Sequence, residues 1–230
     1  LGSAFINGLN KEGVQFGSSQ FSDTEKTGRC IVMVSKDAQR TMSTYLGISQ
    51  KLNEKDINED LIKKSKILYL EGYLWDLDDA QSAIRKSISI AKENGTKIAF
   101  SVSDVFCIER FRESFLEIIK NDCDIVFANE EEIKALTGGS NIDKDLNALM
   151  KEDKILAITR GEQGALIISQ NNKYEISSEK IDNLVDTTGA GDIFAAGFLE
   201  YLIKNHEIQE CGKRGIQLAS KIIQQYGARF

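Results

Sequence analysis

Residues 186–202 read DTTGAGDIFAAGFLEYL, a glycine turn followed by a pattern of apolar residues. Gly189 and Gly191 let the backbone turn tightly and come close to a ligand. After them, apolar residues recur at the spacing of one face of an amphipathic helix, namely Ile193, Phe194, Phe198, Tyr201 and Leu202. We therefore predict a helix that begins at the glycines. Because the first amides of a helix have no internal partner and lie at the positive end of its dipole, this start should attract an anion, typically phosphate.

Asp192 places a carboxylate at this predicted anion site, and three interpretations of it compete. The simplest is a helix-start acid stabilised by the dipole, which is the default for an isolated glycine turn. The second is a dinucleotide fingerprint, since Gly189, Gly191 and Ala195 give G-x-G-x-x-x-A, but a helical pattern follows where a βαβ unit needs a strand. The third is a phosphoryl-transfer site, in which the amides hold developing charge and Asp192 takes the proton of an attacking hydroxyl.

Residues 186–198 match, without a gap, the C-terminal signature of the ribokinase-type (PfkB) carbohydrate kinase family, D-T-x-G-A-G-D followed by an aromatic residue and G-F. This resemblance is far more specific than a pair of glycines. It implies an ATP-dependent kinase that transfers the γ-phosphate to a hydroxymethyl group of a sugar or nucleoside. Asp192 would be the catalytic base, and the amides of Gly189, Ala190 and Gly191 would form the anion hole. The chain contains no Walker A sequence, so the P-loop machinery is not an alternative.

The length of 230 residues and a hydrophobic content of 41% favour a single α/β domain with a substantial core. The formal net charge of −6 gives no support to a nucleic-acid partner. No segment reaches the roughly 18 apolar residues of a membrane helix, so we expect no membrane partner. The four cysteines are scattered and there is one histidine, which argues against structural zinc and Cys-His catalysis. We expect a cytoplasmic protein.

From residue 67 onward, short apolar segments alternate with amphipathic ones. The predicted strands are Ile67–Leu70, Lys97–Val102, Asp124–Phe127, Ile155–Ile158 and Ala165–Ile168. The predicted helices are Asp78–Asn94, Ile108–Lys120, Glu130–Leu136 and Ile142–Met150. This order predicts a doubly wound, mostly parallel sheet with helices on both faces, for which the resemblance implies the ribokinase-like version.

Residues 28–45 are predicted to form a β-hairpin, because two extended segments flank a polar turn. Such hairpins often form a lid or an edge. Since exposed edge strands tend to be covered by a partner, we expect a homodimer through this β lid.

Polar residues follow four of the predicted strands, at the edge where parallel sheets bind ligands. Asn129 and Glu132 alone would be a helix cap and a helix-start acid. The resemblance makes them, through its N-x-x-E motif, residues that hold Mg²⁺ through water. Glu71 ends another strand, where contact with the substrate and burial in a hydrogen-bonded network are equally expected.

The resemblance also implies contacts to ATP and to a monovalent cation such as K⁺. The ATP contacts would come from the turn with Thr159, Gly161 and Gly164, although a plain hairpin explains these glycines equally well. Others would come from Gly215 and Ala219, as the side of the last helix with room for a flat base. Asp186 and Thr188, near residues 227–228, would bind the cation.

The resemblance covers essentially the whole chain, and segments 40–52 and 70–76 resemble the branch with sugar and adenosine kinases. In that family an N-terminal region with a Gly-Gly substrate motif comes earlier, so we expect this chain to be N-terminally truncated, with residues 1–230 forming a single ribokinase-like domain. Two alternatives stay open: an adenosine kinase specifically, or a non-catalytic nucleotide- or sugar-binding protein of the same fold.

Overall fold

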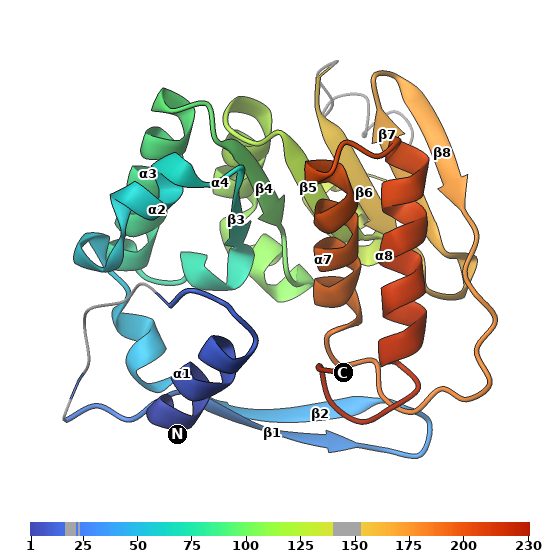
Figure 1. Cartoon of the computed structure of the whole chain (residues 1–230), viewed down its shortest axis with the longest axis horizontal. Helices are drawn as coiled ribbons and strands as arrows, with labels where there is room; N and C mark the ends of the chain where they lie inside the picture. Colours follow the sequence, from blue (N-terminus) through green and yellow to red (C-terminus); the bar gives the residue numbers. More distant parts are fainter. Residues whose placement is uncertain (17–21, 23, 140–152) are drawn as a thin grey trace.

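The structure, a computed structural model, describes residues 1–16, 22, 24–139 and 153–230 (Figure 1). The strands are β1 (Arg29–Val34), β2 (Arg40–Tyr45), β3 (Ile67–Glu71), β4 (Lys97–Ser101), β5 (Ile125–Asn129), β6 (Ile155–Thr159), β7 (Ala165–Ser169) and β8 (Asn172–Ile176). The α-helices are α1 (Gly2–Lys11), α2 (Glu59–Lys64), α3 (Asp78–Glu93), α4 (Val105–Asn121), α5 (Glu130–Thr137), α7 (Ala190–Ile203) and α8 (Ile208–Ile222). Four short 3-10 helices are η1 (Gly47–Lys51), η2 (Glu54–Asp56), η3 (Gly72–Trp75) and η4 (Gly161–Gln163).

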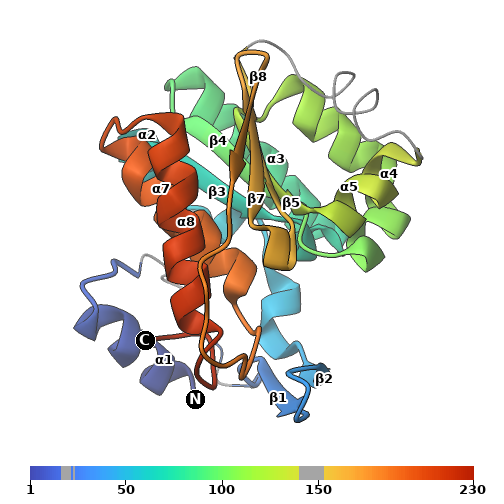
Figure 2. The same ribbon diagram turned by 90° about the vertical axis from the view of Figure 1, so that its right-hand side faces the viewer.

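The main sheet lies between two layers of helices, as the sequence predicts. Its strand order is β3-β4-β5-β6-β7-β8. Figure 2 shows α7 and α8 on one face and α3, α4 and α5 on the other. Each face buries its own apolar cluster. The doubly wound fold with helices on both faces is therefore confirmed.

The predicted helix after the glycine turn is α7, and its apolar face packs on β5. The ring centroids of Phe127 and Phe198 lie 5.5 Å apart, with the rings close to perpendicular. Phe198 is fully buried, and burial of such a side chain contributes roughly 1.5–3 kcal/mol. This packing holds α7 against one face of the sheet.

The first four strands of the sheet, β3 to β6, are parallel, and the last two pairings are antiparallel. The reason is the length of the connections, because residues 160–164 and 170–171 are too few for a crossover. Gln170 and Asn171 have φ of 50° and 62°, which suits the two-residue hairpin between β7 and β8. The sequence did not predict β8, since this edge strand is mostly polar and exposed. The predicted helix 142–150 lies outside the described residues.

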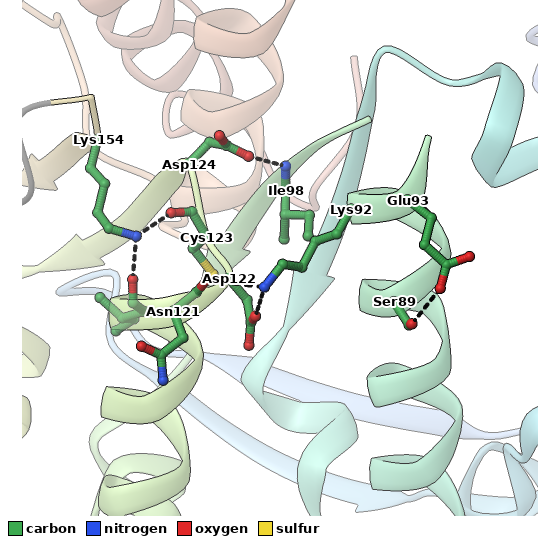
Figure 3. Close-up of polar contacts among 10 residues, drawn as sticks. Ser89, Lys92, Glu93, Ile98, Asn121, Asp122, Cys123, Asp124 and Lys154 are labelled. Carbon is green, nitrogen blue, oxygen red and sulfur yellow. Dashed lines mark hydrogen bonds and ion pairs between the residues drawn. The ribbon is translucent and has the colours of Figure 1, made fainter. Parts of the chain in front are cut away.

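Polar contacts hold the amino ends of the strands together (Figure 3). The buried ammonium of Lys154 donates to the carbonyl oxygens of Ile119 at 2.6 Å and Cys123 at 2.5 Å. The carboxylate of Asp124 accepts from the amide of Ile98 at 2.7 Å. These bonds tie the end of α4 to β4, β5 and β6.

The predicted hairpin is present as the β1–β2 ribbon, which pairs antiparallel and is separate from the main sheet. Figure 1 places it below the carboxyl ends of the sheet, beside α1 and the C-terminus. Among the described residues, no helix combines the length and the apolar character that crossing a membrane requires.

Candidate active site

A cavity of about 790 Å³ lies at the carboxyl ends of the parallel strands. Its lining comes from the β1–β2 ribbon, from η3, from the ends of β4, β5 and β6, from the first turns of α4 and from the start of α7. The predicted site residues among its lining are Glu71, Asn129, Glu132, Thr159, Thr188, Gly189, Ala190, Gly191 and Asp192. The structure thus brings together predicted site residues from four separate segments of the chain.

The glycine turn has the geometry that an anion hole needs. Gly189 caps α7 with φ of 76°, and a Cβ there would lie 2.7 Å from the Cβ of Ala228. Only glycine fits this conformation and this contact without strain. Around Gly191, by contrast, no heavy atom lies within 4 Å of the position of a Cβ. The turn is therefore packed on its outer side and open on the side where the first amides of α7 begin.

Asp192 is the third residue of α7, and it is exposed within the lining of the cavity. It lies near Glu71, the last residue of β3. Burial raises the pKa of Glu71, and the negative charge of Asp192 raises it further. The cavity lining therefore holds two carboxyl groups that interact with each other.

Asn129 and Glu132 form a reciprocal capping box at the start of α5. The Asn129 side chain accepts from the Glu132 amide at 2.8 Å, and the Glu132 carboxylate accepts from the Asn129 amide at 2.8 Å. The Asn129 side-chain amide donates to the other carboxylate oxygen at 2.8 Å. The simple cap interpretation thus describes these residues, although both also line the cavity.

Burial raises the pKa of Glu132. The described residues contain no group of three or more histidine, cysteine or acidic side chains arranged around one metal position. Direct coordination of Mg²⁺ by Glu132 would also compete with its capping bonds. The donor set therefore fits a metal held through water and not one held by protein ligands alone.

Asp186 is buried and ties the glycine turn to the C-terminal segment. One carboxylate oxygen accepts from the amide of Thr188 at 2.9 Å and from its hydroxyl at 2.6 Å. The other accepts from the amide of Gly227 at 3.0 Å. Burial raises the pKa of Asp186, but the hydrogen bonds from Thr188 and Gly227 outweigh it, so the pKa is lowered. A monovalent cation bound here would share both carboxylate oxygens of Asp186 with these donors. The hydrogen bonds that hold the turn are enough to explain why Asp186 lies here.

The packing of α8 accounts for two of the predicted nucleotide contacts without a ligand. A Cβ at Gly215 would lie 2.7 Å from Cδ2 of Phe194, so this residue is closely packed against α7. Ala219 packs against the same apolar cluster. Contact of Gly215 and Ala219 with a nucleotide stays a prediction.

The remaining predicted nucleotide contacts lie at the end of β6 and in the turn after it, and only one of them lines the cavity. Thr159 lines the cavity, whereas Gly161 and Gly164 do not. A Cβ at Gly164 would collide with the carbonyl oxygen of Ile176, so this glycine is required by the hairpin that leads into β7. Gly161, with φ of 55°, has no heavy atom within 4 Å of a Cβ position and remains open to a ligand.

Arg40 is a cavity residue that the sequence reasoning missed. Strand register places Arg40, Met42 and Thr44 on one face of β2, and all three line the cavity. The charge of Arg40 contributes to lowering the pKa of Asp186, which places this cation close to the glycine turn. Alternation along the predicted hairpin was the signal that could have identified this face.

The start of α4 was also predicted too late in the chain. The helix begins at Val105 and not at Ile108, because Asp104 accepts from the amide of Phe106 at 2.8 Å and caps it. The added turn carries Phe106 and Cys107 into the cavity lining, and Arg110 follows in the next turn. The acidic cap before the apolar pattern was the available signal.

The model of the pfkB family of carbohydrate kinases matches residues 1–230, the whole chain. This chain belongs to the pfkB carbohydrate kinase family. The adenosine kinase of Sinorhizobium meliloti superposes with a TM-score of 0.95 at 36% identity, over 99% of this chain and 70% of that one. A probable sugar kinase from Rhizobium etli gives 0.94 at 36% identity, over 99% and 69%.

The curated relatives of this pfkB chain likewise include both fructokinases and adenosine kinases. Probable fructokinase-5 of Arabidopsis thaliana is 29% identical over 215 residues, which is 90% of this chain. The chain spans 66% of the length of that fructokinase, just under two thirds. Because sugar and adenosine kinases of the family match equally well, similarity alone does not separate the two acceptor classes.

Proposed function

We propose that the protein is an ATP-dependent kinase that phosphorylates a hydroxymethyl group of a nucleoside or sugar. The observation that carries this proposal is the position of Asp192, two residues after the first residue of α7, beside an open glycine turn and inside a cavity large enough for a small acceptor. A carboxylate there is unfavourable for anion binding alone, but it is in place to receive a proton next to a phosphate.

In the proposed reaction the acceptor oxygen forms a bond to the γ-phosphorus while the bond from that phosphorus to the bridging oxygen of ADP breaks. The acceptor proton goes to Asp192. The amides of Gly189, Ala190 and Gly191 stabilise the charge on the phosphoryl oxygens, and the guanidinium of Arg40 faces the same cavity from the ribbon. Mg²⁺ supplies charge neutralisation at the phosphates when bound, and Asn129 and Glu132 are the residues that would hold it through water.

The shape of the cavity wall favours a nucleoside over a simple sugar as acceptor. Phe106 and Tyr73 line the cavity and are 59% and 58% exposed. Aromatic side chains left this open on a concave surface offer flat apolar area to a ligand. A nucleobase has a flat aromatic ring to place on that area, whereas a monosaccharide has none.

The test is to incubate the purified protein with ATP, Mg²⁺ and one acceptor at a time, namely adenosine, inosine, ribose or fructose, and to measure ADP. We expect ADP with at least one acceptor and the largest kcat/KM with a nucleoside. Faster turnover of fructose or ribose would contradict the nucleoside assignment but not the kinase. ADP formation from none of them, with retained binding of acceptor or ATP, would favour the non-catalytic binding protein.

A further inference from the structure

One wall of the cavity is formed by η3 and by the first turns of α4, and Arg110 lies in it. The guanidinium of Arg110 forms an ion pair with the carboxylate of Asp76, from Nη1 to Oδ1. Its central carbon lies 5.1 Å from the ring centroid of Phe106 and 5.0 Å from that of Phe111. A carboxylate and two aromatic rings therefore hold this side chain in place, so less rotamer freedom is lost when it binds a ligand.

The ion pair also holds the wall itself. Phe111 has φ of −130° and ψ of 23°, values that interrupt α4 and separate residues 105–110 from the rest of the helix. Asp76 directly follows η3, so its contact with Arg110 joins residues 105–110 to the segment after β3. Without this ion pair, the interruption at Phe111 would leave residues 105–110, and Arg110 with them, less restrained.

The guanidinium of Arg110 keeps hydrogen-bonding capacity for a ligand. A guanidinium carries five N–H donors, and the ion pair with Asp76 engages one of its terminal nitrogens. The side chain is 43% exposed and lines the cavity. The donors that Asp76 does not take are therefore not all buried, and they belong to a side chain that lines the cavity.

The charge of the cavity indicates what kind of ligand group reaches this wall. Two arginines and four carboxylates line it: Arg40, Arg110, Glu71, Asp76, Glu132 and Asp192. The excess of carboxylates disfavours an additional anionic group on the acceptor. A neutral group with hydrogen-bond acceptor atoms fits better, and the ring nitrogens and carbonyl oxygens of a nucleobase have this character.

Arg110 and Asp192 lie on different helices around the cavity. Arg110 belongs to a helix on one face of the sheet, and Asp192 begins a helix on the other face (Figure 2). Asp192, Phe106 and Arg110 all line this cavity, so an acceptor with its hydroxymethyl group at Asp192 has Arg110 and the ring of Phe106 within the same space.

We propose that Arg110 is a specificity-determining residue, which donates hydrogen bonds to acceptor atoms of the base of a nucleoside substrate, with Asp76 as its positioning partner. This inference rests on the proposed function, because it names the part of the acceptor that the same cavity recognises. A monosaccharide lacks this part. Its binding should therefore not depend on Arg110.

The test compares Arg110→Lys with the unsubstituted protein, since lysine keeps the charge opposite Asp76 and removes the planar fork. We expect the KM for adenosine to rise roughly ten- to a hundredfold, which is the fold-change that loss of a charge-assisted hydrogen bond produces. The kcat for adenosine, the KM for ATP and all constants for ribose should change less than about twofold. Calorimetry with adenosine and no nucleotide should show the same weakening of binding as the KM.

Arg85→Lys is the matched control. Arg85 also lies over an aromatic ring, 5.1 Å from the centroid of Trp75, and pairs with Glu117 at 3.7 Å, but it does not line the cavity. The Arg85→Lys substitution should leave the KM for adenosine and the KM for ribose unchanged. Asp76→Asn tests the positioning partner, and it should raise the KM for adenosine in the same direction as Arg110→Lys without adding to it in the double variant.

An equal loss for adenosine and ribose, or no loss for either, overturns the inference even if the protein is a kinase. If the protein makes no ADP, calorimetry decides alone: adenosine binding that depends on Arg110 supports the inference while the proposed function fails. Absence of adenosine binding by the unsubstituted protein overturns the inference about Arg110. Should Arg110→Lys unfold, Arg110→Gln, which still donates to Asp76, is compared in the same way.

Discussion

At the scale of single residues, the site depends on carboxyl groups whose environments differ. Asp186 is buried but accepts three hydrogen bonds, so its pKa is lowered. Glu71 is half-buried beside Asp192, so its pKa is raised. The sequence identified both residues, because one belongs to a specific motif and the other ends a strand. It gave no indication of how their environments differ, since the bonds to residue 227 and the approach of residue 192 join distant parts of the chain.

Glu71→Gln should stabilise the folded protein at neutral pH. The raised pKa means that the folded state binds a proton more tightly than the unfolded state, whose value is near 4.5. The wild-type protein therefore loses stability as pH rises from that value through the folded pKa, and an uncharged glutamine does not. Urea unfolding should show a gain for the variant at pH 7 that shrinks toward zero below about pH 4. A gain that is independent of pH would contradict this account.

At the scale of elements, regular apolar spacing was enough to predict the parallel strands, α3 and α7, because these are held by their own buried faces. Elements set by a single contact were predicted less well. The start of α4 depends on one cap from Asp104, and β8 depends on a two-residue turn and the edge of β7. The close packing of Gly215 against Phe194 was not predicted for a similar reason, because a small residue in a helix permits contact with a ligand or with another helix.

Lys154→Met should lower the free energy of unfolding by about 1–3 kcal/mol, since the carbonyls of Ile119 and Cys123 would lose their donor while remaining buried. Ile119 lies in the last turn of α4, where carbonyls have no partner within the helix. Chemical denaturation measures the loss. Lys120→Met, an exposed lysine in the same turn, is the control and should stay within about 0.5 kcal/mol. Equal effects of the two substitutions would show that Lys154 has no capping role.

At the scale of the whole molecule, the sequence predicted one cavity at the carboxyl ends of the strands, because the rule for parallel sheets needs only the order of the elements. It did not predict the inner face of the β1–β2 ribbon as a wall of that cavity, since the position of a separate hairpin depends on the whole fold. The outer face of the ribbon carries Ile31, Met33 and Tyr45, which are 65%, 55% and 45% exposed. This apolar face supports the expected homodimer.

Sedimentation velocity should show a dimer for the purified protein, and Ile31→Glu together with Met33→Glu should convert it to a monomer, because the charges would be buried without partners at the interface. Ile203→Glu is the control: this residue is 39% exposed at the far end of α7, and its substitution should leave the dimer intact. A wild-type protein that sediments as a monomer at every concentration would exclude the homodimer.

The central claim is that Asp192 accepts the proton of the acceptor hydroxyl, and the rate of ADP formation by Asp192→Asn tests it most directly. Asparagine keeps the shape and removes the base, so kcat should fall by roughly 10² to 10⁴ while ATP binding, measured by calorimetry, is retained. Asp60→Asn, an exposed aspartate in the first turn of α2, should leave kcat unchanged. If Asp192→Asn keeps kcat within a few-fold of the wild-type value, Asp192 is not the base and the proposed mechanism is wrong.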